Sequence, residues 1–339
     1  MIVRSGDFES LNPYNASMGS LLSSVRRGRG LTAFAAATVA VMVLVILWGA
    51  VVRATGSGAG CGANWPLCNG GLLPHHPRIQ TLIEFTHRAT TGVCSALALV
   101  VLVWVFVARP RGDRARKAAV CSVALLFIEA FLGRALVLHG WVDRNTSDAR
   151  TVMQCVHFTN TLLLLGAFTL TWWWLRNPSI QDQPRADRLR SRTLAWVTLA
   201  LTILTGATGS VAALADTLFP APSLREGLAQ DFAANAPLLV HMRWMHPAAA
   251  LLAFIAAVSL CRHLARTHAQ WVGGLLLLQI ALGVADMVTL APVALQVLHL
   301  LGADLFWIVS VATCSNLIFS EVLLHAATET VLISSAQHP

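Results

Sequence analysis

The chain has 339 residues, of which 56% are hydrophobic and only 12% are charged, and its mean hydropathy is +0.64. A soluble domain carries about 25% charged residues, so this composition excludes a soluble globular protein and indicates a membrane protein. The formal net charge is +8, but the basic residues gather in loops between apolar runs. Such clustering is typical of a topology signal and gives little support to nucleic-acid binding.

Eight apolar runs are long enough to cross a hydrocarbon core, which takes about 20 residues of helix. They cover residues 31–52, 82–107, 118–138, 151–175, 193–213, 238–260, 270–291 and 293–322. The first run and its polar flank are too long for a cleaved signal peptide, so we interpret it as a retained anchor. We expect an all-α polytopic membrane protein with eight transmembrane helices.

Basic residues predict the orientation of these helices. Arginine and lysine are dense before the first run and after the second, fourth and sixth, whereas the alternate loops hold only Arg53, Arg78, Arg144, Arg150 and Arg225. By the positive-inside rule, both termini are cytoplasmic. We therefore expect a multi-pass protein of the cell inner (cytoplasmic) membrane.

The eight runs form a four-helix unit that occurs twice. Four short matches occur in the same order: Trp48-Gly49-Ala50 with Thr205-Gly206-Ala207, Glu84-Phe-Thr-His87 with Arg243-Trp-Met-His246, Glu129-Ala-Phe-Leu-Gly133 with Gln279-Ile-Ala-Leu-Gly283, and Gln154-Cys-Val-His157 with Gln296-Val-Leu-His299. Each unit has an even number of helices, so the repeat is parallel and the fold should be two pseudo-symmetric four-helix bundles. The expected segments are a cytoplasmic N-terminal segment 1–30, an N-terminal half 31–175, a cytoplasmic linker 176–192, a C-terminal half 193–325 and a cytoplasmic tail 326–339.

Four histidines lie at one predicted depth, near the outer ends of the second, fourth, sixth and eighth runs. They are His87, His157, His246 and His299. At 1.5 Å per residue, all four rings should lie about 8–12 Å below the outer interface. A lone histidine in a membrane more often bonds a neighbouring helix, but four at equal depth indicate a functional site near the outer face.

Pairs of neutral imidazoles facing each other suit a low-spin heme iron, which takes axial ligands from both sides. Zinc would need three or four converging ligands. We expect one heme between His87 and His157 and another between His246 and His299. His241 lies about 140° around the helix axis from His246, so only one of the two should face the heme, and His246 matches the second run.

The halves differ beside these histidines. Glu84 lies one turn before His87, whereas Arg243 holds the matching position in the C-terminal half. A carboxyl beside a heme can accept or deliver protons. The alternative is an ion pair of Glu84 with Arg53 or Arg88, two residues that could instead bind heme propionates. The asymmetry favours chemistry in the first half and a bound cofactor in the second.

Two of the seven cysteines, Cys61 and Cys68, lie in the first outer loop, where an oxidising compartment permits a disulfide. Their spacing does not match a CxxC redox motif or a zinc site. The other five we interpret as small buried apolar residues.

Three segments resemble the heme A synthase family: Gly49-Ala-Val-Val-Arg53-Ala-Thr-Gly-Ser-Gly58, Cys61-Gly-Ala-Asn-Trp-Pro-Leu-Cys68 and Glu84-Phe-Thr-His87-Arg88. The resemblance implies an oxidoreductase that converts the C8 methyl of heme O to a formyl group through a hydroxymethyl intermediate, supplying heme A to terminal oxidases. It implies heme O as substrate in the N-terminal half and heme b as bound cofactor in the C-terminal half.

Carried over to this chain, the family pattern makes Glu84, His87 and His157 the catalytic residues, with the two histidines on heme O iron. It makes His246 and His299 the ligands of heme b iron, with Arg53 and Arg88 binding heme, and Cys61–Cys68 a disulfide. Pro247 departs from the pattern, because the family often has His-Arg there. Glu129 and Arg134 add unexpected charge to the third run, and we expect them to pair or to reach a propionate.

Two other functions fit the same histidines: a non-catalytic bis-histidine b-type cytochrome, and a heme-transfer protein that binds heme exchangeably. A prenyltransferase that makes heme O is disfavoured, because the cytoplasmic loops lack an aspartate-rich diphosphate–magnesium motif. The expected partners are the heme O-producing prenyltransferase, an electron acceptor and the lipid bilayer. The sequence leaves a homo-oligomer open.

Overall fold

A computed structural model of the chain describes residues 28–74, 77–177 and 188–319. These residues are helical apart from loops and an isolated β-bridge between Cys68 and Gly71. The helices are α2 (Arg29–Ala54), α3 (Ile79–Ala108), α4 (Arg114–Leu138), α5 (Asp148–Arg176), α6 (Arg188–Leu218), α7 (Leu224–Asp231), α8 (Leu238–His241), α9 (Met245–Cys261), α10 (Arg266–Val288) and α11 (Val293–Phe319). Most of the expected segment 1–30, most of the linker 176–192 and the whole tail 326–339 lie outside the described residues.

Eight spans among these helices are long and apolar enough to cross a membrane, with α8 and α9 together forming the sixth. The prediction of an all-α chain with eight transmembrane helices is therefore confirmed. The ends differ by a few residues. The third span, for example, begins at Arg114 because the Asp113 side chain caps it by accepting a bond from the Ala115 N–H, so the basic residues continue the helix.

The sixth span departs from its predicted form as one continuous helix. It is interrupted by a turn at residues 242–244, between the end of α8 and the start of α9. Pro247 explains the break, since proline has no N–H to donate and its ring would clash with the carbonyl of Arg243 four residues earlier. As a result, His241 and His246 lie on separate helices.

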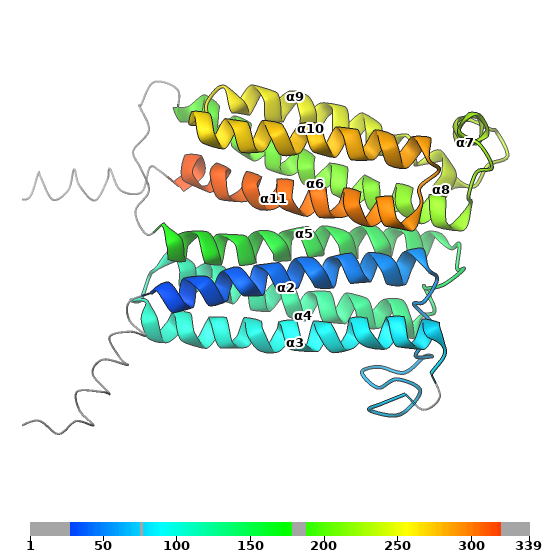
Figure 1. The fold of residues 1–339 in the computed structure, drawn as a ribbon, viewed down its shortest axis with the longest axis horizontal. Coiled ribbons are helices and arrows are strands. Elements are labelled where there is room, and N and C mark those ends of the chain that lie inside the picture. The colour runs from blue at the N-terminus through cyan, green and yellow to red at the C-terminus, as the bar shows by residue number, and fades with distance from the viewer. Residues whose placement is uncertain (1–27, 75–76, 178–187, 320–339) are drawn as a thin grey trace, which may run out of the picture.

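Helices α2–α5 lie together on one side of the molecule, and α6 with α9–α11 lies on the other (Figure 1). Helices α5 and α11 run along the seam and are the most enclosed spans, each with half of its most apolar window buried. Trp307 of α11 packs across this seam. Its indole N–H donates to the Leu162 carbonyl at 2.7 Å, and its ring lies against Gly166, where an added Cβ would be 3.4 Å from the indole.

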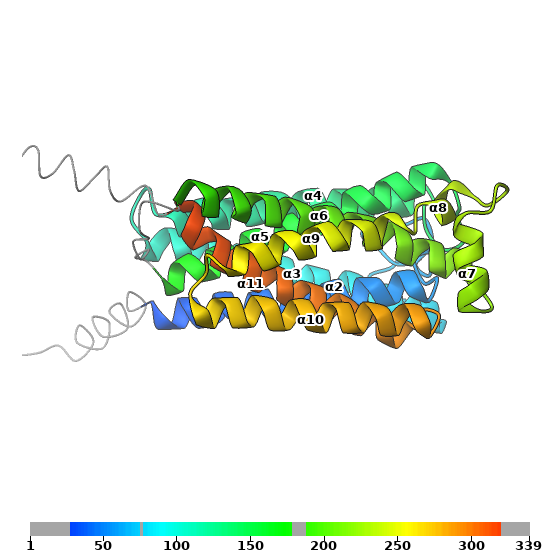
Figure 2. The same cartoon turned by 90° about the horizontal axis from the view of Figure 1, so that it is seen from above.

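The start of α2 and the end of α11 lie at the same end of the bundle (Figure 1). The first outer loop, α7 and α8 lie at the opposite end, and the view turned by 90° shows α7 beyond the ends of the long helices (Figure 2). The arginine-rich connection between α3 and α4 is at the α2-start end. Which of these two ends faces the cytoplasm stays a prediction from the basic residues.

Candidate functional site

The four predicted histidines lie near the starts of their membrane spans, at the end of the bundle that carries the outer loops. The rings of His246 and His299 face each other with centroids 6.2 Å apart and planes at 85°. An imidazole nitrogen binds a metal at about 2 Å, so two rings on opposite sides of one iron have centroids about 6 Å apart. This pair therefore has the spacing of two axial ligands.

His241 takes no part in that pair. Its Nδ1 lies 2.7 Å from the carbonyl oxygen of Asp231, at the end of the outer helix α7. His246 Nδ1 instead lies 3.0 Å from the carbonyl oxygen of Thr205 in α6. A ring N–H donated to a backbone carbonyl fixes the tautomer and leaves the other nitrogen free for a metal.

Each of the four rings lies against a glycine of a neighbouring helix. The glycine and histidine pairs are Gly49 with His87, Gly133 with His157, Gly209 with His246, and Gly283 with His299. A Cβ added at Gly209 or Gly283 would come within 2.9 or 3.0 Å of the imidazole, and one at Gly49 within 3.1 Å. At Gly133 the approach would be an ordinary 3.7 Å. The missing side chains leave room for the rings in both halves.

The sequence match pairs Gly49 with Gly206. The glycine of α6 that contacts a histidine is Gly209, three residues later. Gly206 packs against Leu162 and Phe158 of α5, whereas Gly209 contacts His246. Either glycine follows a threonine in α6, and the sequence offers no signal to choose between them. Only the helix packing shows which one is equivalent to Gly49.

Several ring nitrogens of these histidines make no hydrogen bond with the described residues. The buried Nδ1 atoms of His87, His157 and His299 have no hydrogen-bond partner among the described residues. No cluster of three or more His, Cys, Asp or Glu suited to a metal ion occurs in the described part of the chain. The paired rings of His246 and His299 and the glycines beside all four histidines fit axial ligation of heme better than a zinc site, for which the described residues offer no ligand set.

Glu84 is buried, with 3% exposure, and its two carboxylate oxygens have different partners. Oε2 accepts from the backbone N–H of Cys61 at 2.7 Å, and Oε1 pairs with Arg88 Nη2 at 2.5 Å. Arg88 also donates to the carbonyls of Asn64 and Leu67, at 2.6 and 2.8 Å. The ion pair between Glu84 and Arg88 is confirmed, and together these two residues tie the first outer loop to α3.

The disulfide between Cys61 and Cys68 is present and closes that loop, with both cysteines buried. Among the free cysteines, Cys94 and Cys314 are buried as expected. Cys121 is exposed, and Cys155 and Cys261 are half-buried, which corrects the prediction that all five are buried. An exposed thiol on a membrane helix faces lipid rather than core.

Arg53 crosses between the two halves. Its Nη1 donates to the Ala213 carbonyl at 2.7 Å and to Thr217 Oγ1 at 2.6 Å, both on α6. Its Nη2 donates to Gln296 Oε1 of α11 at 2.6 Å. The guanidinium groups of Arg53 and Arg88 thus already bind protein oxygens, and their expected binding of heme propionates remains a prediction.

Glu129 contacts a predicted ligand, and the expected pair with Arg134 is not formed among the described residues. Its Oε1 lies 2.9 Å from His157 Nδ1, and Arg134 is exposed. Two side chains of α5 donate to the same carboxylate: Asn160 Nδ2 at 2.6 Å and Thr161 Oγ1. Sequence reasoning missed this contact, although the repeat frame pairs Glu129 with Gln279, and Gln279 in turn lies beside His299.

Arg243 takes the place of Glu84 in the C-terminal half but turns toward the outer loop. Its Nε donates to Asp231 Oδ1 at 2.7 Å, and its Nη1 donates to Asp216 Oδ1 at 3.0 Å. These bonds tie α7 to α6. The matched positions therefore both anchor an outer loop, with opposite charges.

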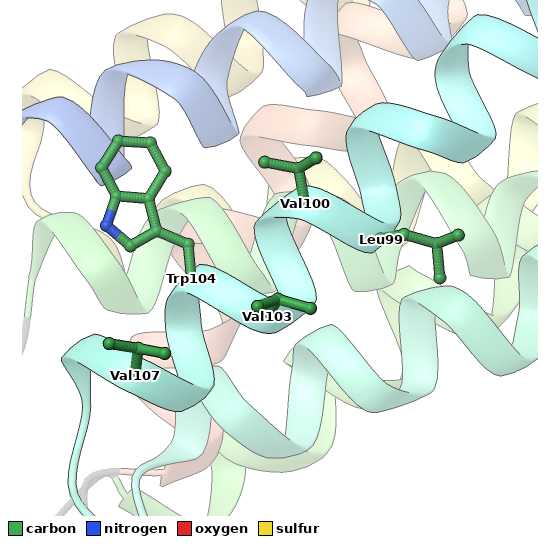
Figure 3. Close-up of a pocket in the computed structure, with 5 residues that line it drawn as sticks. All are labelled: Leu99, Val100, Val103, Trp104 and Val107. Atoms are coloured by element: carbon green, nitrogen blue, oxygen red, sulfur yellow. The ribbon is translucent and has the colours of Figure 1, made fainter.

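An apolar hollow lies on α3, lined by Leu99, Val100, Val103, Trp104 and Val107 (Figure 3). Trp104 is about 25 Å along the helix from His87. The hollow has almost no polar surface and belongs to the lipid-facing wall of the bundle. It is separate from the histidine pairs.

The chain is similar to several known proteins. Residues 32–311 match the cytochrome oxidase assembly protein family. The chain belongs to this family, that of the heme A synthases. A heme A synthase of Geobacillus kaustophilus is 34% identical over 142 residues, covering 42% of either chain. Another, of Lysinibacillus sphaericus, is 35% identical over 182 residues, covering 53% of this chain and 55% of that one.

A longer relative carries a different name. A protoheme IX farnesyltransferase of Thermus thermophilus is 40% identical over 281 residues, which cover 79% of this chain but 45% of that protein. The chain thus spans about half the length of the curated relatives it matches. The family membership rests on the match over residues 32–311.

Proposed function

We propose that the chain is a heme A synthase that oxidises the C8 methyl of heme O to a formyl group through a hydroxymethyl intermediate. The observation that carries this proposal is the pair of unlike histidine sites. Both halves share the glycine-lined histidines, but only the N-terminal half has carboxylates, Glu84 and Glu129, at the matched positions. A cofactor site and a reaction site would differ in this way.

In this proposal His87 and His157 hold heme O, and His246 and His299 hold heme b. Heme iron supplies the redox chemistry when bound. Glycines on α2, α4, α6 and α10 let the imidazoles lie close to neighbouring helices, which fixes the ring positions. The Thr205 carbonyl orients His246 by accepting from its Nδ1–H.

Glu84 is the proposed proton acceptor beside heme O. Its carboxylate is held by Arg88 and by the Cys61 N–H, so it cannot rotate freely in its pocket. The side chain is buried and contacts the backbone of Cys61, one end of the disulfide. A buried, oriented carboxylate is the arrangement that general-base chemistry requires.

The proposal also names the membrane in which the protein lies and the enzyme that would supply heme O. The charge difference between the loops supports an inner-membrane protein with cytoplasmic termini and both heme sites near the outer face. The Thermus relative, named a farnesyltransferase, has a region 40% identical to this chain, which supports a heme O-producing prenyltransferase as partner. More than half of that protein lies outside the match, so its own activity is not carried over.

The test is to express the chain with a heme O-producing enzyme and to separate the extracted hemes by chromatography. We expect heme A and its hydroxylated precursor to appear. If heme O persists and neither product forms, the chain is not a synthase, and a b-type cytochrome or a heme-transfer protein becomes the better function.

Glu84→Gln separates these functions further. A synthase should lose most of its product while still binding heme, whereas an electron carrier should be unaffected. Glu226→Gln is the matched control, because Glu226 is an exposed outer-loop glutamate in the other half. Wild-type heme A formation by Glu84→Gln would remove Glu84 from the mechanism.

A further inference from the structure

Glu129 of α4 lies beside His157, and its carboxylate contacts three side chains of α5. Asn160 Nδ2 and Thr161 Oγ1 donate to its carboxylate, and His157 Nδ1 lies 2.9 Å from Oε1. Two donors beside the imidazole favour the ionised carboxylate, which accepts bonds and donates none. A negative charge is therefore placed on the side of His157 that carries Nδ1.

The C-terminal half has a neutral group at the matched position. Gln279 Nε2 donates to the His299 backbone carbonyl at 3.0 Å and lies 3.4 Å from His299 Nε2. Glu129 and Gln279 have nearly the same size and occupy the same frame, four residues before Gly133 and Gly283. The two neighbours differ by one unit of charge and in the ring nitrogen that they approach, Nδ1 of His157 and Nε2 of His299.

That charge acts on any metal bound to the histidine. A carboxylate beside a ligating imidazole orients the ring and makes it a stronger electron donor. It also stabilises the more positive oxidation state of a nearby iron, and the effect is strong where little water screens it. The Gln279 amide beside His299 supplies no such charge.

We propose that Glu129 is a positioning residue that holds His157 and biases the heme of the N-terminal half toward the ferric state, while Gln279 leaves the heme of the C-terminal half easier to reduce. This inference rests on the proposed function, because it takes His157 as a ligand of the substrate heme. An electron shared between the two sites would then reside mainly in the C-terminal half.

The other charged groups near the N-terminal pair do not cancel this bias. Arg88 is paired with Glu84, so those two form a neutral unit. Arg134 is exposed, and no ion pair joins it to Glu129 in the described parts of the chain. Glu129 thus remains the carboxylate in contact with His157.

The experiment is a potentiometric titration of the full-length, heme-loaded protein, followed by the absorbance of each heme. His157→Ala and His299→Ala assign the two signals to their halves. Glu129→Gln should raise the midpoint potential of the N-terminal heme by about 59 mV, a tenfold change in its ferric-to-ferrous ratio, and leave the other heme unmoved. Gln279→Glu should lower the potential of the C-terminal heme.

Arg134→Gln is the matched control, since it changes a charge on the same helix without touching His157. The inference is overturned if Glu129→Gln leaves the N-terminal potential unchanged, shifts both hemes equally, or shifts it no more than Arg134→Gln does. If Glu129→Gln does not fold, the variants Glu129→Asp and Gln279→Glu test the inference instead. The first keeps the charge and should stay near the wild-type potential, and the second must shift the C-terminal heme.

These outcomes are separable from the proposed function. Heme A formation without the potential shift removes the role of Glu129 alone. The shift without heme A formation removes the synthase reaction and leaves the role of Glu129 standing. Retention of the N-terminal heme by His157→Ala would remove the ligand assignment on which both depend.

Discussion

The two halves of the molecule share the geometry around their histidines and differ in the charge beside them. In both halves each imidazole packs against a glycine of the next helix. Beside these rings the N-terminal half has Glu84 and Glu129, whereas the C-terminal half has Arg243 and Gln279. The two halves therefore share the small residues that lie against the imidazoles and differ in the charged residues beside them.

This difference separates the residues that would hold a bound group from the residues that could react with it. Close packing tolerates few changes, since a side chain at Gly49, Gly209 or Gly283 would press on a ring. Charge at the neighbouring positions can change without disturbing that packing, provided the new group finds partners. Arg243 shows this, because Asp216 and Asp231 take up its guanidinium.

Removing a ligand should have the largest effect. His299→Ala is expected to abolish low-spin heme b in the C-terminal half and leave the N-terminal site occupied, because one imidazole alone cannot fill both axial positions. His157→Ala should do the reverse. Absorption spectra of the purified variants test this, and an unchanged spectrum in His299→Ala would remove that ligand from the site.

Filling a glycine should have the next largest effect. Gly209→Ala would place a Cβ 2.9 Å from the His246 ring, so the ring must move, at a cost of about 1–3 kcal/mol. We expect heme retention in the C-terminal half to fall about tenfold or more. Gly133→Ala is the matched control in the other half, where the 3.7 Å contact is ordinary. Equal heme retention by the two variants would contradict a role of close packing.

Arg53→Gln tests the connection between the halves. It removes charge-assisted hydrogen bonds to α6 and α11 and should lower the free energy of unfolding by about 2–4 kcal/mol. Thermal unfolding in detergent measures the change. Arg134→Gln, an exposed arginine, should have little effect, and a similar loss in both would show that Arg53 acts only through its charge.

Cys61→Ser should have an effect confined to the N-terminal half. Opening a loop with a sequence separation of seven removes about 2–3 kcal/mol of stabilisation by the chain-entropy relation. Because the Cys61 N–H binds Glu84, the variant should make less product while the C-terminal heme spectrum stays unchanged. Full product formation would show that the disulfide does not hold Glu84 in place.

Much of the fold could be predicted because a membrane imposes a simple rule on the sequence. Each span must be apolar over about 20 residues, so composition alone located eight helices. The break before α9 was missed, although Pro247 was visible, since a proline near a helix start is often tolerated. The Cys61–Cys68 disulfide and the Glu84–Arg88 pair join residues close in sequence, and both were anticipated.

The sequence by itself determined the eight spans, their charge asymmetry and the four recurring histidines, because these features depend on local composition and spacing. Only the tertiary structure decided that Glu129 contacts His157, that Arg53 binds α6 and α11, and that Gly209 rather than Gly206 faces His246. The physical reason is distance along the chain. Arg53 finds partners 160 to 243 residues away, and the rotation of one helix against another, which sets such contacts, is not encoded in any single segment.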